Sequence, residues 1–277
     1  MDSTATATIL PAADIPAQPT NAPIPPTIPP TIPPTTTPIP KETVWPASRV
    51  TAGAMIYDPN SQHIFILGGI RRIGDYEGLS EVWAYDPNSN LWQQKGDLPT
   101  KIIICAAYDE ESARIIVVAR GTYKDSATWA YDPVTDQWQE MNPEIVPRQR
   151  YGVACSYDAE SDRVILFGGT HGLQPYNPYG DTWTYDYNSN TWTEMQPAAA
   201  PPPRSLQEMA YADDSDRVLM WGGVLDISTG TEDLRMWAYD VNTDTWESYP
   251  NNSNNTVSWY LFGMVYHPPS DQLIMFT

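Results

Sequence analysis

A motif of fixed length recurs four times and constrains the fold more than any other feature of the sequence. It reads Trp-x-Tyr-Asp, then a short polar turn, then a second Trp nine residues after the first. The copies are WAYDPNSNLW (83–92), WAYDPVTDQW (129–138), WTYDYNSNTW (183–192) and WAYDVNTDTW (237–246), with the Trp pairs Trp83/Trp92, Trp129/Trp138, Trp183/Trp192 and Trp237/Trp246. Spacing is constant within the motif and varies between motifs. This pattern indicates rigid hairpins joined by adjustable loops.

A second signature precedes each Trp pair, as in AMIYDPNSQHIFILGG at 54–69. A Tyr-Asp strand end is followed by a polar turn, a continuous apolar run and a glycine pair. The glycine pairs are Gly68-Gly69, Gly168-Gly169 and Gly222-Gly223, and the second unit has Ala119-Arg120-Gly121 instead. Apolar runs without alternation indicate strands that are covered on both faces. The pattern of each unit therefore predicts four short strands, and four antiparallel strands are typical of one blade of a β-propeller. The tyrosines and both tryptophans of each motif are expected to be core side chains that fill the wedge between adjacent blades.

The glycine pairs, the Tyr-Asp tyrosines and the spaced Trp pairs resemble the kelch repeat family, and the resemblance covers about 46–277. It implies an all-β, kelch-type β-propeller with four full four-stranded blades and a two-stranded partial fifth blade. The propeller is predicted over 45–277, with units at approximately 46–100, 101–147, 148–200, 201–250 and, in part, 257–277. Kelch propellers usually close with six or seven blades, so the chain is expected to be incomplete at its C-terminus. Two alternatives remain: a five-bladed ring completed by residues 42–45, or two arcs that self-associate through the open blade edge.

Residues 1–44 are predicted to be a disordered Pro/Thr-rich spacer. Twelve prolines lie between Met1 and Pro40, and proline rules out helix and interior strand but favours polyproline II. Such a segment commonly acts as a spacer, and it is alternatively a docking site for a proline-binding module or an O-glycosylated stalk. The spacer favours an extracellular or cell-surface location, although no signal peptide is visible.

Composition excludes several classes of partner. The chain has 34 acidic and 15 basic residues and a formal net charge of −19, so nucleic acid is not expected as a partner. The apolar runs are far shorter than the ~18 residues of a membrane span, so membrane insertion is not expected. The acidic turns lack the pattern of an EF-hand loop, and neither a metal nor a cofactor is predicted. Cys105 and Cys155, the two cysteines, are interpreted as small core side chains.

The candidate ligand-binding residues lie where a propeller commonly binds ligands, at one mouth of the central channel. Basic residues precede the innermost strands and would form a ring of cations: Arg49, Lys101, Arg150 and Arg204. The loops after the glycine pairs add Arg71, Arg72, His171, Tyr176 and Arg235. The structural alternative is that each arginine bonds loop carbonyls or pairs with a nearby carboxylate.

The sequence favours a non-catalytic binding module that recognises a protein or glycan partner at the channel mouth, and no catalytic residue is assigned. The alternative is a carbohydrate-active enzyme, a sugar mutarotase or epimerase, in which Arg150, His171 and Glu232 would be drawn together. A copper oxidase of the galactose-oxidase kind, which shares this repeat, is much less favoured, because it needs a Tyr–Cys cross-link and clustered histidines.

Overall fold

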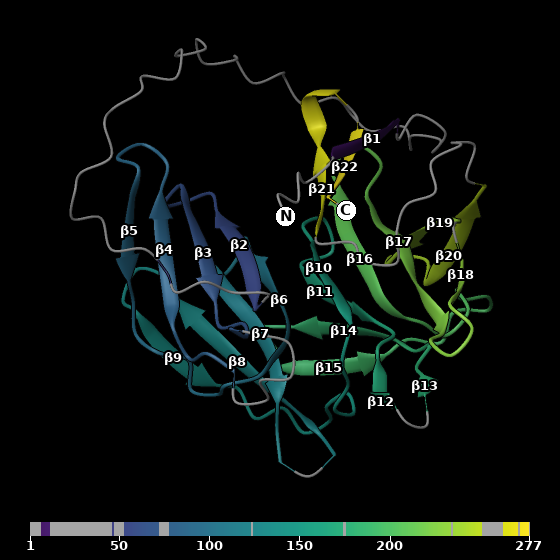
Figure 1. Ribbon diagram of the computed structural model, residues 1–277, viewed down its shortest axis with the longest axis horizontal. Coiled ribbons are helices and arrows are strands. Elements are labelled where there is room, and N and C mark those ends of the chain that lie inside the picture. Colours follow the sequence, from purple (N-terminus) through teal and green to yellow (C-terminus); the bar gives the residue numbers. More distant parts are fainter. Residues whose placement is uncertain are drawn as a thin grey trace.

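The structure, a computed structural model, describes residues 7–11, 46, 53–71, 78–122, 124–173, 176–233, 235–250, 263–270 and 272–276. Within these residues the chain is built from antiparallel sheets that follow one another around an arc in chain order (Figure 1). The prediction of all-β propeller blades is confirmed. No helix in these ranges has the length and hydropathy that crossing a bilayer would require.

Four complete blades each contain four main strands, ordered from the centre outward. Blade 1 consists of β2 (Ala54–Asp58), β3 (His63–Leu67), β4 (Val82–Asp86) and β5 (Leu91–Gln94). Blade 2 consists of β6 (Ile103–Asp109), β7 (Arg114–Arg120), β8 (Ser126–Asp132) and β9 (Gln137–Glu140). Blade 3 consists of β10 (Ala154–Asp158), β11 (Arg163–Phe167), β14 (Thr182–Asp186) and β15 (Thr191–Glu194). Blade 4 consists of β16 (Ser205–Ala212), β17 (Arg217–Asp226), β19 (Met236–Asp240) and β20 (Thr245–Tyr249).

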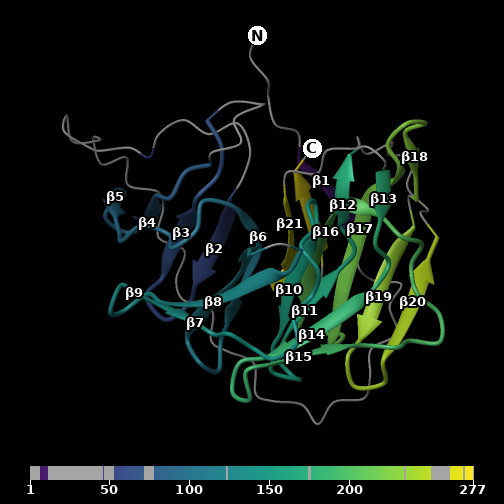
Figure 2. The same cartoon turned by 90° about the horizontal axis from the view of Figure 1, so that it is seen from below.

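Short extra strands decorate blades 3 and 4. A two-stranded ribbon of β12 (Thr170–Leu173) and β13 (Tyr176–Pro178) lies between β11 and β14, and β18 (Thr231–Glu232) pairs with β17. All three lie in the connections between the second and third main strands. Figure 2 shows them on the same side of their blades.

The partial fifth blade contains β21 (Gly263–His267) and β22 (Gln272–Phe276), joined through the short 3₁₀ turn Pro268–Ser270. The sequence predicts two strands here, and the structure adds a third: β1 (Ala7–Pro11) pairs antiparallel with β22. Five residues of the predicted spacer thus occupy the third-strand position that β4, β8, β14 and β19 occupy in the other blades. The alternative donor, residues 42–45, lies outside the described residues.

The turn after each Tyr-Asp strand end has one geometry. The connections between first and second strands, and between third and fourth strands, are all four residues long. Their last residue has positive φ in the turns ending at Asn90, Asp136, Asp162, Asn190, Asp216 and Asp244. Asn and Asp tolerate this left-handed conformation better than most side chains. In every one of these turns the side chain also accepts a hydrogen bond from the tyrosine hydroxyl five residues earlier.

The hydrophobic core lies between adjacent blades. Separate clusters of buried side chains fill the junctions between blades 1 and 2, 2 and 3, 3 and 4, and 4 and 5. The continuous apolar runs of β7, β11 and β17 are buried on both faces because each blade has two neighbours. Each fully buried aliphatic side chain contributes about 1.5–3 kcal/mol relative to exposure.

Inner-strand tyrosines connect each blade to the turn of the blade before it. The Tyr108 hydroxyl accepts from Asn60 Nδ2 at 3.0 Å, and the Tyr157 hydroxyl accepts from the Glu111 amide at 3.4 Å. The Tyr266 hydroxyl donates to Asp214 Oδ2 at 3.0 Å. Tyr57 is the equivalent residue of blade 1 and is 54% exposed. The face of blade 1 that points away from blade 2 is therefore uncovered by the described residues. The prediction of self-association through an open blade edge stays a prediction.

Outer-strand tryptophans make a second connection between blades. Trp192 Nε1 donates to Thr128 Oγ1 at 2.9 Å, and Trp246 Nε1 donates to Thr182 Oγ1 at 3.0 Å. Each threonine lies on the third strand of the preceding blade, three residues before its tyrosine. Both hydrogen bonds are buried, so each tryptophan contributes both apolar area and a satisfied polar group.

The outer-strand tryptophans of blades 1 and 2 differ from these. Trp92 and Trp138 are only half-buried, so they are less deeply buried than predicted, although Trp138 packs against the core between blades 1 and 2. Trp138 packs on Tyr131 of its own blade, with ring centroids 4.7 Å apart, but its indole N–H has no hydrogen-bond partner among the described residues. The reason is that blade 1 has Val82 where the next two blades have the threonine acceptor, and valine accepts no hydrogen bond. Trp92 packs on Tyr85 at 4.9 Å, and it belongs to the blade whose far face the described residues leave uncovered.

The interpretation of the two cysteines as small core side chains missed that they pair, although both pack against the core between blades 2 and 3. Cys105 and Cys155 form a disulfide with a Cα–Cα distance of 5.8 Å, a separation that suits a disulfide. They lie on β6 and β10, the inner strands of neighbouring blades, which contact each other. A spacing of 50 residues is close to one repeat, so the two cysteines occupy almost equivalent places in successive units. The disulfide therefore bridges blades 2 and 3 near the central axis.

Candidate functional site

The two ends of the arc differ in how much the blades vary. At one end lie the four-residue turns, which are alike from blade to blade. At the other end lie the connections between second and third strands, and these differ in every blade: 68–81, 121–125, 168–181 and 227–235. We call these the turn end and the variable end. All the candidate ligand-binding residues described here belong to the variable end, because they lie in these connections or just before an inner strand.

Two of the predicted mouth residues are buried structural groups. Arg150 is 1% exposed and binds the Asp181 carboxylate with both terminal nitrogens, at 2.6 and 2.8 Å. It also donates to the carbonyls of Arg148 and Gly168 and lies over the Tyr179 ring, with Cζ 4.5 Å from the ring centroid. Almost every donor of this guanidinium is used within the protein. The structure thus favours the structural alternative over ligand binding for this residue.

Arg204 repeats the arrangement one blade later. It is fully buried and donates to the carbonyls of Pro202 and Gly222 and, at 2.6 Å, to Asp233 Oδ2. Burial alone would raise the pKa of Asp233, but hydrogen bonds from Arg235, Arg204 and Trp237 outweigh burial and hold that pKa well below its ordinary value. The carboxylate is therefore ionised under ordinary conditions and fixes the loop to the start of the inner strand.

The remaining predicted residues have mixed positions. Tyr176 links blade 3 to blade 4, because its hydroxyl donates to the Val224 carbonyl at 2.5 Å. Arg71 pairs with Glu81 at 3.4 Å on the surface, and such exposed pairs contribute little stability. Lys101 and His171 are exposed. Arg49 and Arg72 lie outside the described residues.

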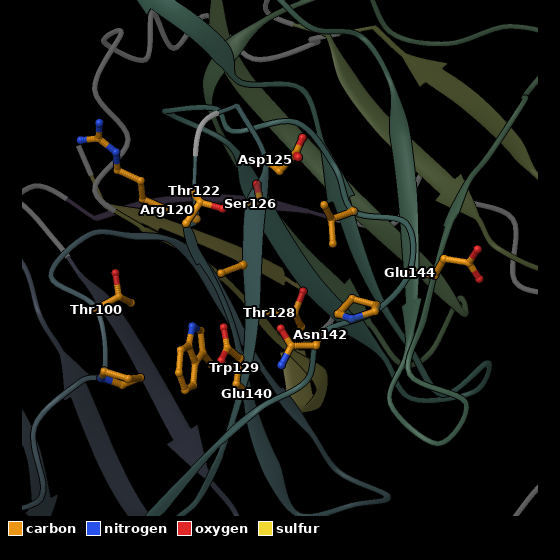
Figure 3. A pocket seen from close by; sticks show the side chains of 15 residues that line it. Thr100, Arg120, Thr122, Asp125, Ser126, Thr128, Trp129, Glu140, Asn142 and Glu144 are labelled. Atoms are coloured by element: carbon orange, nitrogen blue, oxygen red, sulfur yellow. The ribbon is translucent and has the colours of Figure 1, made fainter.

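A pocket opens at the variable end of blade 2 (Figure 3). Its volume is about 500 Å³, within the range of about 300–1,000 Å³ that is common for ligand sites. Pro99 and Thr100 line it from the link out of blade 1, and Trp129 and Thr128 line it from β8. Its charged lining comes from Arg120, Asp125, Glu140 and Glu144. Figure 3 shows Trp129, Glu140 and Asn142 close together on one side of the pocket.

The pocket lies where blade 2 departs from the repeat. In blades 1, 3 and 4 the third-strand tryptophan donates its indole N–H to a carboxylate: Trp83 to Glu81 at 3.0 Å, Trp183 to Asp181 at 2.7 Å and Trp237 to Asp233 at 3.0 Å. In blade 2 the residue two before the tryptophan is Ala127. Among the described residues, the indole N–H of Trp129 has no hydrogen-bond partner.

This pocket was not predicted from the sequence, although a signal for it was present. Ala127 stands two residues before the third-strand tryptophan, where the other blades have the charged residues Glu81, Asp181 and Arg235. In the same unit, Ala119-Arg120 replaces the glycine pair. Arg120 is exposed at the end of β7 and lines the pocket.

A cluster of three carboxylates lies at the opposite, turn end. Ligand oxygens of Asp109, Glu111 and Asp162 lie within 4.8 Å of one another. Burial raises the pKa of Asp109, while Asn188 Nδ2 donates to Glu111 and Asp162, and the Tyr157 hydroxyl donates to Asp162. These hydrogen bonds account for the cluster as part of the turns between blades 2 and 3.

Comparison with known proteins agrees with the blades. A family model described as the KLHDC2/KLHL20/DRC7 Kelch-repeats domain matches residues 120–276, which is more than half of the chain. No curated protein matches the chain. The match and the propeller-like sheets together support a protein-interaction module in general terms. The chain therefore belongs to the Kelch-repeat family.

Proposed function

We propose that the chain is a non-catalytic binding module that holds a protein partner at its variable end. The observation that carries this proposal is the contrast between the two ends. Four-residue turns repeat at one end, while connections of 14, 5, 14 and 9 residues, each with its own sequence, lie at the other. Loops that vary on a rigid scaffold are the usual carriers of binding. The pocket of blade 2 lies at the same end.

The catalytic alternative has less support from the described residues. Arg150, the cation that a sugar-active site would use, is buried and bonded to Asp181. Both thiols are consumed in the disulfide, so neither is available for the thioether cross-link of a copper oxidase. A glycan partner is the second candidate ligand, because Trp129 could stack on a sugar ring beside the polar groups of the pocket.

The disulfide supports an oxidising compartment for the folded chain, because such bonds are rare in reducing cytosol. This agrees with the expectation of an extracellular or cell-surface location. Labelling of intact cells with a membrane-impermeant reagent, directed at a tag on the chain, tests the location.

The test of the proposed function is a selection of peptides from a random-sequence display library against the full chain. Binding of the selected peptides is then compared among variants at the two ends. Lys101→Ala and His171→Ala alter the variable end, and Val134→Ser and Asn88→Ala are matched controls on exposed turn-end side chains. We expect weaker binding for one or both variable-end variants and unchanged binding for the controls. Peptides that bind all four variants and a Trp129→Ala variant of the blade 2 pocket like the parent, or turnover of sugars by the chain, would refute the proposal.

A further inference from the structure

In blade 4, the guanidinium of one arginine is bound by two other side chains of the same blade. Arg235 lies over the ring of Trp237, with Cζ 4.9 Å from the ring centroid. The same guanidinium donates from Nε to Asp233 Oδ1 at 2.8 Å and from a terminal nitrogen to Asp233 Oδ2 at 3.0 Å. An aromatic face and a carboxylate thus bind one guanidinium, a combination that is favourable both as a cation–π contact and as a charge-assisted hydrogen bond.

Blade 2 keeps two of these three groups and lacks the arginine. Counting back from the third-strand tryptophan, blade 4 has Asp233, Arg235 and Trp237, and blade 2 has Asp125, Ala127 and Trp129. Asp125, Ala127 and Trp129 all line the pocket. The side chain that is missing from blade 2 is the cation. Asp125 does not contact Trp129 as Asp233 contacts Trp237, because β8 is extended from Ser126; Asp125 lies in another part of the pocket, and Glu140, opposite Trp129 in the sheet, is the carboxylate beside the ring (Figure 3).

The charges of the pocket favour a cation as well. Three carboxylates line it, from Asp125, Glu140 and Glu144, against the single guanidinium of Arg120. Within the described part of the chain, none of the three carboxylates has an ion-pair partner. The chain as a whole has a formal charge of −19, so its electrostatic field attracts positively charged partners at distances up to roughly the Debye length.

We propose that the pocket of blade 2 binds the guanidinium of an arginine side chain from a partner protein, in the place that Arg235 takes in blade 4. The inference rests on the proposed function, because it names the chemistry by which a protein partner is recognised. The planar guanidinium can stack on the Trp129 ring while its fork of N–H groups faces a carboxylate. A lysine ammonium lacks this planar fork. Arginine and tryptophan are also the side chains that dominate binding at protein interfaces.

The test uses small probes on the full chain: the N-acetylated amides of arginine, citrulline and lysine. Citrulline has nearly the shape of arginine without its charge. Binding is followed by the indole N–H resonance of Trp129, assigned with a Trp129→Phe variant. We expect saturable perturbation by the arginine probe and at least about ten-fold weaker binding of the citrulline and lysine probes, since the charge and the fork are both used.

Two variants test the pocket itself. Ala127→Arg restores the blade 4 sequence and should fill the site from within, lowering affinity for the arginine probe at least about ten-fold. Ala127→Ser is its matched control and should bind like the parent. Glu140→Gln keeps the pocket open and should also weaken binding at least about ten-fold, which preserves the test if Ala127→Arg fails to fold.

Several results would overturn the inference. Equal binding of citrulline or lysine would remove the guanidinium as the recognised group, and unchanged binding to Ala127→Arg would place the probe elsewhere. Perturbation of Trp129 by methyl glycosides but not by arginine would assign the pocket to sugars. Selected peptides that bind the variable end without arginine would support the proposed function and refute this inference. Binding of the arginine probe to a chain that selects no peptide would support the site and count against the proposed function.

Discussion

The disulfide between blades 2 and 3 gives the sharpest test of the structure. Cys105 and Cys155 enclose a loop of 50 residues, and the chain-entropy relation for a loop of that length gives a stabilisation of about 4 kcal/mol. Replacing either cysteine by alanine should therefore lower the free energy of unfolding by about that amount. At a urea slope of roughly 3 kcal/mol per M, the unfolding midpoint should fall by about 1.3 M.

The assay is urea unfolding followed by tryptophan fluorescence, with and without dithiothreitol. The parent should lose its extra stability in reductant, and the double variant Cys105→Ala/Cys155→Ala should be insensitive to reductant. Alkylation followed by intact-mass measurement counts free thiols in each sample. Two free thiols in the parent under oxidising conditions, with equal midpoints for parent and double variant, would refute the pairing and with it the close approach of β6 and β10.

Three further predictions concern buried polar groups. Thr182→Val removes the acceptor of Trp246 Nε1 while keeping the side-chain volume, and it should cost about 1–3 kcal/mol in urea unfolding; no loss would mean that this indole finds another acceptor. Arg204→Met breaks the fully buried ion pair with Asp233 and should cost about 3–5 kcal/mol in the same assay, whereas a cost below about 1 kcal/mol would show the pair to be solvated. Burial raises the pKa of Glu208 to about 7, so its carboxyl remains protonated in the folded state at pH values where it ionises in the unfolded chain, and stability falls as pH rises from the unfolded pKa toward 7. Glu208→Gln should therefore stabilise the fold by on the order of 3 kcal/mol at pH 8 and by less than about 1 at pH 5, and a gain independent of pH would contradict this reasoning.

Local pattern predicted the blades because each unit repeats its own turn chemistry. The tyrosine and the Asn or Asp five residues later bond within one turn, as Tyr185 and Asn190 do. Such a contact is visible in the sequence as a fixed interval. The four strands per unit and the place of the Trp pairs followed from it.

Contacts between units were harder to foresee from one sequence. The disulfide was missed because its members lie 50 residues apart, although that interval is close to the repeat. The indole N–H of Trp138, unpaired among the described residues, was missed because it depends on Val82, a residue of the preceding blade. The carboxylate partners of the arginines predicted for the mouth were not foreseen: Arg150 binds Asp181, which lies 31 residues away in the loop. Whether an arginine faces solvent or a carboxylate depends on how that loop folds back, and its length varies between blades.

The pairing of β1 with the fifth blade was also not predicted, because its two strands lie far apart in the sequence. Ala7–Pro11 pairs with residues near the other end of the sequence, beginning with Ala7 opposite Phe276. Proline composition predicted a spacer over 1–44, and composition carries no information about a partner so far along the chain. The short run Ile9-Leu10 is the apolar part of that segment.

The tyrosine contacts between blades all have the same sense: Tyr157 binds the turn of blade 2, and Tyr266 binds the turn of blade 4. Each unit is thus anchored to its predecessor, and only nearest neighbours share an interface. The stack has a polarity. A substitution in one turn, for example Asn60→Ala, which removes the side-chain donor to the Tyr108 hydroxyl, should loosen the next blade in the chain more than the blade that carries the substitution. Hydrogen exchange of backbone amides would then be faster in the blades that follow the substituted turn in the chain than in the blades that precede it.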